Sequence, residues 1–215
     1  MLTRFRAKLR ILIYPLAELI AKKCRNPNAV TLAGLAIALS TPIATWFYHI
    51  ALPILIAVSA YMDALDGAVA RLTGRVTKFG AVLDSFCDRV EELCYLLSLA
   101  LMGLNPLLIA IAVATSYLIS YLRALGELRG VRMEGVGLFE RGERVVMIFV
   151  ISIVMLTMSG RVSVFIATAL LIAMITLNTV TIIQRVVHIY KSLRGSEKPT
   201  LETVGEPSSS SRTRA

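Results

Sequence analysis

Residues 63–88 read DALDGAVARLTGRVTKFGAVLDSFCD and place four aspartates, Asp63, Asp66, Asp84 and Asp88, among apolar residues. Side chains three or four positions apart share one face of a helix, so each pair of aspartates points one way. If the two helices face each other, the four carboxylates meet. Carboxylates that close together in a poorly solvated place repel unless they are protonated or neutralised by cations. The stretch therefore predicts two helices that present an acidic site to each other.

The residue types in this stretch predict a site for divalent metal ions. Oxygen-only ligands suit a hard cation such as Mg²⁺, with Mn²⁺ as an alternative, and four carboxylates are enough for two ions. Gly67 and Gly80 lack side chains, so a ligand or a neighbouring helix can come close to the acids. The competing interpretation is that the acids only pair with the basic residues Arg71, Arg75 and Lys78. Acids within membrane segments are costly and usually functional, which favours the site.

The spacing of these residues resembles the signature of the CDP-alcohol phosphatidyltransferases: Asp, two residues, Asp-Gly, two residues, Ala-Arg, eight residues, Gly, three residues, Asp, three residues, Asp. All fixed positions of that signature are present, namely Asp63, Asp66, Gly67, Ala70, Arg71, Gly80, Asp84 and Asp88. The resemblance implies that Asp63, Asp66 and Asp84 hold one Mg²⁺ and that Asp63, Asp84 and Asp88 approach a second. It also implies that Asp88 is the base that accepts the proton of the acceptor hydroxyl.

The same resemblance implies a site for a CDP-activated lipid beside the acids. The apolar segment that precedes the acids opens with NPNAVT at residues 26–31, and in the family this entrance is part of the nucleotide site. The residues implied to contact the CDP-lipid are Asn28, Ala29, Val30, Thr31, Asp66, Gly67, Ala70, Arg71 and Thr77. The alternative for Asn28 and Thr31 is plain capping of a helix that starts at Pro27.

The composition of the chain is typical of a membrane protein. Of 215 residues, 56% are hydrophobic, and the mean hydropathy is positive. The net charge of +9 comes from basic patches between apolar runs. This pattern favours anionic lipid headgroups and phosphorylated substrates as partners over nucleic acid.

We expect an all-α, polytopic membrane protein with three segments. Residues 1–25 are basic and amphipathic and predict a helix that lies in the membrane interface. Residues 26–194 predict a membrane domain of six transmembrane helices; residues 27–62 alone contain no Asp, Glu, Lys or Arg and are long enough for two spans. The further spans are expected near 80–102, 107–122, 145–158 and 162–184. Residues 195–215, rich in Ser, Pro and charge, predict a disordered tail. The family resemblance also implies the six-span fold and a homodimer.

The placement of Lys and Arg predicts the orientation in the cell membrane. Basic residues occur in the N-terminal segment, after the second and fourth spans and at the C-terminal end, whereas the intervening turns contain only Arg161. The positive-inside rule therefore places both termini and the acids at the cytoplasmic side.

A second resemblance concerns the acceptor. Residues 120–146, SYLRALGELRGVRMEGVGLFERGERVV, are similar to the corresponding loop of the phosphatidylinositol phosphate synthases and the archaeal archaetidylinositol phosphate synthases. The likeness lies in the basic residue after Ser-Tyr and in Glu-Arg-x-Glu-Arg. The chain departs from the family pattern at two positions: it has Arg123 where the family has Lys, and Gly142 where the family has Pro. The acceptor implied is an inositol phosphate. Its phosphate needs cations, which could be supplied by Arg123, Arg141, Arg144 and Arg185.

The sequence thus predicts an enzyme that transfers a phosphatidyl-type group from a CDP-activated lipid to an inositol phosphate and releases CMP. Within the same chemistry, glycerol phosphate or serine could be the acceptor, and a soluble CDP-inositol could be the donor. A divalent-cation transporter is the rival from another class, because buried acids also line ion paths. Whether the lipid is a diacyl ester or an archaeal isoprenoid ether stays open.

Overall fold

The computed structural model describes residues 14–22 and 26–196, and the regular structure in these ranges is entirely helical. Residues 14–22 form a short helix. It is followed by α2 (Pro27–Phe47), α3 (Ala51–Thr73), α4 (Lys78–Leu101), α5 (Pro106–Leu128), α6 (Arg141–Thr157) and α7 (Gly160–Ser196). The all-α prediction is confirmed. The interfacial helix expected over residues 1–25 is described only at 14–22, and the expected tail lies outside the described residues except for 195 and 196, which end α7.

Local sequence signals set the helix ends around the acids. Asn26, not Asn28, caps α2: its side chain accepts a hydrogen bond from the backbone N–H of Asn28 at 3.2 Å. α3 ends at Gly74, whose left-handed φ of 66° turns the chain without a steric penalty. Thr77 then caps α4 by accepting from the N–H of Gly80 at 2.9 Å. This tight connection holds the end of α3 close to the start of α4.

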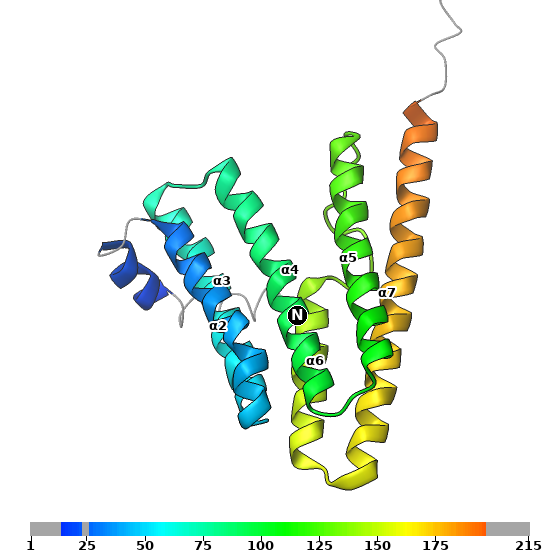
Figure 1. Ribbon diagram of the computed structural model, residues 1–215. Helices are drawn as coiled ribbons and strands as arrows, with labels where there is room; N and C mark the ends of the chain where they lie inside the picture. The colour runs from blue at the N-terminus through cyan, green and yellow to red at the C-terminus, as the bar shows by residue number, and fades with distance from the viewer. Residues whose placement is uncertain (1–13, 23–25, 197–215) are drawn as a thin grey trace, which may run out of the picture.

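The helices form two groups that meet along α4 (Figure 1). α2 lies against α3 and α4, while α5 and α6 both pack on α7. α4 contacts α5 and α6 as well, and α3 contacts α6. An apolar core runs across the junction and includes Leu52, Ile56, Leu96, Ile148 and Leu171. The aspartates of the predicted site meet Arg141 at this same junction.

Four of the described helices are long and apolar enough to cross a membrane: α2, α3, α5 and α7. α4 lacks a sufficiently apolar window because its first half contains the acids, and α6 has only 17 residues. Hydropathy therefore identifies four of the six expected spans. α7 has 37 residues and extends well beyond the span expected at 162–184.

Gly137 fixes how the loop between α5 and α6 docks on α7. Its φ is 114°, and a Cβ at this position would lie 2.5 Å from Thr181 Cγ2. The nearby N–H of Phe139 donates to Thr181 Oγ1 at 3.1 Å. The loop therefore packs directly against α7, and no side chain fits at position 137.

We expect Gly137→Ala to destabilise the protein by about 2 kcal/mol or more, because it adds both backbone strain and a clash. The measurement is the melting temperature in detergent. The matched control is Gly142→Ala in α6, where a Cβ would meet nothing within 4 Å and the backbone is helical, so stability should stay equal or rise slightly. Equal melting temperatures of the two variants would contradict this account.

Candidate active site

The two aspartate pairs come from α3 and α4, and the structure brings them together. Carboxyl oxygens of Asp63, Asp88 and Glu91 all lie within 4.8 Å of one another. Asp84 interacts electrostatically with the other three aspartates. The facing helices predicted from the spacing are therefore present. We define the acid centre as the five carboxylates Asp63, Asp66, Asp84, Asp88 and Glu91.

Arg141, at the start of α6, inserts its guanidinium among these carboxylates. Its Nη2 donates to Asp63 Oδ2 at 2.9 Å and to Glu91 Oε2 at 2.8 Å. Its Nη1 lies 2.5 Å from Asp88 Oδ1. Among the described residues the acids thus pair with Arg141, and more distantly with Arg89, whose Nη1 is 3.5 Å from Asp88 Oδ2. The basic residues close in sequence, at positions 71, 75 and 78, form no ion pair with them in this part of the chain.

The acid centre fits a hard divalent cation. Its donors are all carboxylate oxygens, the type that Mg²⁺ and Mn²⁺ take. One of them, Glu91 Oε1, is buried and has no hydrogen-bond partner among the described residues. The single charge of Arg141 offsets only part of the negative charge gathered here, and buried unpaired charge is strongly unfavourable. A cation would remove that imbalance.

A cavity of about 150 Å³ lies between the start of α2, the second half of α3 and the start of α4. We call it the donor pocket. It is lined by six of the residues predicted to contact the CDP-lipid: Asn28, Thr31, Asp66, Gly67, Ala70 and Thr77. The other three do not line it. Ala29 is exposed, Val30 packs in a small apolar core, and the Arg71 guanidinium lies over Gly67, 3.3 Å from where a Cβ would be.

Close contacts explain two residues of the donor pocket. Thr31 Oγ1 donates to Asp66 Oδ2 at 2.5 Å, so Thr31 fixes the orientation of a signature carboxylate. A Cβ on Gly80 would lie 3.0 Å from Thr77 Oγ1 and 3.3 Å from Asn28 Oδ1. The pocket wall therefore requires a very small residue at position 80.

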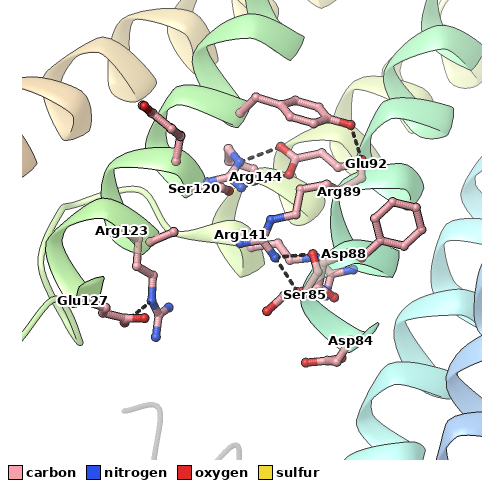
Figure 2. A pocket seen from close by; sticks show the side chains of 14 residues that line it. Asp84, Ser85, Asp88, Arg89, Glu92, Ser120, Arg123, Glu127, Arg141 and Arg144 are labelled. Carbon is pink, nitrogen blue, oxygen red and sulfur yellow. Dashed lines mark hydrogen bonds and ion pairs between the residues drawn. The ribbon is translucent and has the colours of Figure 1, made fainter. Parts of the chain in front are cut away.

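A larger cavity, of about 600 Å³, opens between α4, α5 and α6 (Figure 2). We call it the acceptor cavity. Asp84 and Asp88 of the acid centre line one end, and Figure 2 shows Arg141 beside Asp88. The other charged residues that line it are Arg89, Glu92, Arg123, Glu127 and Arg144.

The four arginines predicted to bind the acceptor phosphate have different surroundings. Arg141 and Arg144 line the acceptor cavity, and Arg144 is held in two contacts by Glu92, at 2.6 and 2.9 Å. Arg123 lines a more open part and pairs with Glu127 at 3.0 Å.

The structure does not bring Arg185 to the cavity lining. Its side chain is buried, and it donates to the carbonyl oxygens of Val136 at 2.9 Å and Ile119 at 2.6 Å. In this position it ties α5 and the following loop to α7.

Sequence analysis did not assign a role to Glu91 or Glu92. Both are buried, and both pair with an arginine of α6. The signal was present in the spacing: Glu91 follows Asp88 by three residues and Asp84 by seven, so all three share one helix face. Glu92 lies one position further around α4 and therefore meets a different arginine.

The fold and this site place the protein in a known class. The family model of the CDP-alcohol phosphatidyltransferases matches residues 25–191, and the chain belongs to this family. The resemblance of the acid spacing to the family signature is thereby confirmed, and the chain is an enzyme of this class rather than a cation transporter.

The chain is similar to named relatives over most of its length. It is 37% identical over 180 residues to archaetidylinositol phosphate synthase of Aeropyrum pernix, with 83% of this chain and 90% of that protein covered. It is 32% identical over 193 residues to phosphatidylinositol phosphate synthase of Corynebacterium glutamicum, covering 85% and 86%. The crystal structure of Mycobacterium tuberculosis phosphatidylinositol phosphate synthase with CDP-DAG bound superposes with a TM-score of 0.72 at 26% identity, covering 82% of this chain and 92% of that one.

Proposed function

We propose that this enzyme transfers a lipid-linked phosphoryl group from a CDP-activated lipid to a hydroxyl of an inositol phosphate, with release of CMP. The observation that carries the proposal is that the donor pocket and the acceptor cavity meet at one residue, Asp84, which lines both. Two substrates bound in the two cavities would therefore meet at the acid centre. The names of the similar synthases and the CDP-DAG in the related crystal structure support the choice of substrates.

Asp88 is the residue that we propose as the base. It belongs to the acid centre and also lines the acceptor cavity, where the acceptor hydroxyl would lie. As Asp88 takes the hydroxyl proton, the acceptor oxygen bonds to the phosphorus attached to the lipid, and the bond from that phosphorus to CMP breaks. Four carboxylates are enough to hold two Mg²⁺ or Mn²⁺ ions, and the residues that would hold them are Asp63, Asp66, Asp84 and Asp88. These cations would neutralise the pyrophosphate and the departing phosphate.

The guanidinium groups that line the acceptor cavity favour a phosphorylated acceptor. Arg141 lies beside the acids, Arg144 borders the cavity, and Arg123 lies at its more open part. Guanidinium groups bind phosphate oxygens with strong, directional hydrogen bonds. A neutral alcohol such as free inositol would leave these donors without that partner.

The test is a screen of acceptors with one CDP-lipid, with CMP release as the readout. Inositol phosphate should exceed free inositol in kcat/KM by roughly tenfold to a hundredfold, because a charge-assisted contact contributes about 1.5–3 kcal/mol. Glycerol phosphate and serine should be poorer acceptors. Equal use of free inositol, or a preference for glycerol phosphate, would contradict the proposed acceptor. The same screen with diacyl and isoprenoid ether CDP-lipids identifies the donor.

We further propose that α2 to α7 all span the cell membrane, with the acid centre at the cytoplasmic side. The charged residues of α4 lie between Lys78 and Glu92, and the rest of the helix, LCYLLSLAL at 93–101, is apolar. α6 is apolar after Arg144. Large apolar side chains are exposed on the outside of the helices, as lipid contact requires, for example Ile43, Leu107 and Phe165. In this arrangement the helix at 14–22 lies at the cytoplasmic interface, and the family resemblance favours a homodimer, which cross-linking would test.

Cysteine labelling tests the orientation. Val76 in the turn between α3 and α4 and Tyr48 after α2 are both highly exposed, and Cys87 and Cys94 are buried. In a background with Cys24→Ser, Val76→Cys should react with a membrane-impermeant reagent only from the cytoplasmic side. Tyr48→Cys should react only from outside. The reverse pattern would overturn the orientation and the access of cytoplasmic substrates to the site.

A further inference from the structure

Glu91 stands outside the family signature, yet its side chain lies inside the acid centre. It is fully buried at the middle of α4. Oε2 accepts from Arg141 Nη2 at 2.8 Å, while Oε1 has no hydrogen-bond partner among the described residues. A Cβ on Gly34 of α2 would lie 3.6 Å from that oxygen, so α2 closes over it. A buried carboxylate in this position is costly unless it is paired, and its partner is Arg141.

Arg141 connects the acid centre with the acceptor cavity. Its two Nη atoms face Asp63, Asp88 and Glu91, and the same side chain lines the cavity and is partly exposed there. Its Nε is buried without a partner in the described part of the chain. Arg141 can therefore bind a ligand in the cavity only if its guanidinium is held at this border.

The three carboxylates that hold Arg141 have different roles in the proposed reaction. Asp63 and Asp88 belong to the signature, and an oxygen that binds a cation or accepts a substrate proton is no longer free to hold an arginine. The proposed reaction assigns the cations to the four aspartates, whereas Glu91 Oε2 already accepts from Arg141. It is thus the partner that can keep Arg141 in place throughout the reaction.

The neighbouring residues repeat the arrangement. Glu92, the next residue of α4, holds Arg144 in two contacts at 2.6 and 2.9 Å. Arg144 follows Arg141 by three residues, so both lie on one side of α6. Consecutive glutamates of α4 thus each fix one arginine at the cavity wall.

We propose that Glu91 is a positioning residue, which holds the Arg141 guanidinium between the acid centre and the acceptor cavity so that Arg141 can bind the acceptor phosphate. The proposal rests on the proposed function. It gives a role in acceptor binding to a residue that itself touches neither substrate.

The test is a double-mutant cycle with Glu91→Gln, Arg141→Gln and the combination. Glu91→Gln keeps the side-chain size and removes the charge. It should raise KM for inositol phosphate about tenfold and change KM for the CDP-lipid and the half-saturating Mg²⁺ concentration less than about twofold. If Glu91 acts through Arg141, the double variant should have the same acceptor KM as Arg141→Gln alone. Isothermal titration of inositol phosphate in the absence of CDP-lipid should show the same loss of affinity without turnover.

Glu134→Gln is the matched control. Glu134 is exposed in the loop before α6 and pairs with Arg132 at 3.1 Å, so the same chemical change should leave all constants unaltered. If Glu91→Gln does not fold, Glu91→Asp keeps the charge but withdraws it by one methylene, and should give a smaller rise in acceptor KM.

Three results would overturn the proposal. A raised Mg²⁺ requirement with unchanged acceptor KM would make Glu91 a metal ligand instead. Additive effects in the double variant would show that Glu91 does not act through Arg141. A lower melting temperature with both KM values unchanged would make the role structural only. A wild-type protein that does not use inositol phosphate would refute the proposed function itself. If the wild type does use inositol phosphate and Glu91→Gln has a normal acceptor KM, only the role of Glu91 is refuted.

Discussion

Asp88→Asn should lower turnover by about a thousandfold or more while CDP-lipid binding changes only a few fold. A positioned base contributes roughly 10²- to 10⁴-fold to a rate, and the amide cannot accept the hydroxyl proton. The donor pocket does not include Asp88, so the nucleotide contacts should remain. The measurements are CMP release under single-turnover conditions and CDP-lipid binding followed by thermal shift.

The same change at the other three aspartates is the comparison for Asp88→Asn. The chain contains no aspartate besides these four. Asp63→Asn, Asp66→Asn and Asp84→Asn should each abolish turnover and also weaken metal binding, because each removes a proposed cation ligand. Glu134→Gln, an exposed carboxylate changed to an amide, should be as active as the unmodified protein. Substantial turnover by Asp88→Asn would remove Asp88 from the role of base.

Removal of divalent cations should abolish CMP release, and Mg²⁺ or Mn²⁺ should restore it. Three carboxylates of the acid centre, Asp63, Asp88 and Glu91, contact the Arg141 guanidinium, and a bound pyrophosphate would add more negative charge to the same place. Coulomb repulsion among such groups is large in a poorly solvated site. We expect a loss of at least about a thousandfold in excess chelator, since metals stabilise the transferring and leaving phosphates by several kcal/mol.

Two controls separate the loss of metal from damage to the protein. Chelator already saturated with Mg²⁺ should have no effect. The circular dichroism of the chelated protein should keep its helical signal, because Arg141 still offsets part of the charge of the acid centre. Full activity in excess chelator would refute a metal-dependent transfer.

The sequence was sufficient for the parts of the site that depend on local spacing. Asp63 with Asp66, and Asp84 with Asp88, lie on shared helix faces because three- and four-residue spacing requires it. The turn between them follows from Gly74, which ends α3 with a left-handed φ. The family signature then placed the donor pocket, where six predicted residues line the cavity.

Contacts between distant segments could not be predicted in the same way. Arg141 reaches Asp63 across 78 positions of the chain, and no local pattern encodes which arginine of the α5–α6 region meets which acid. A pattern based on charge alone groups Arg185 with the other arginines, but its side chain is buried, donates to backbone carbonyls and is not part of the cavity lining. Hydropathy does not identify α4 as a candidate span, because the charged residues that build the site lower the hydropathy of this helix.

The division of the helices into two groups has a consequence for how such enzymes can diversify. The donor pocket is built by residues between 27 and 84, whereas α5 and α6 contribute to the acceptor cavity only from residues 117 to 144. The short turn at residues 102–105 separates these stretches in the chain. A single genetic crossover in this turn could exchange α5 to α7 for those of a homologue. The segment that builds the donor pocket would stay intact. Recombination at this point would let a lineage acquire a new headgroup without rebuilding the chemistry of transfer.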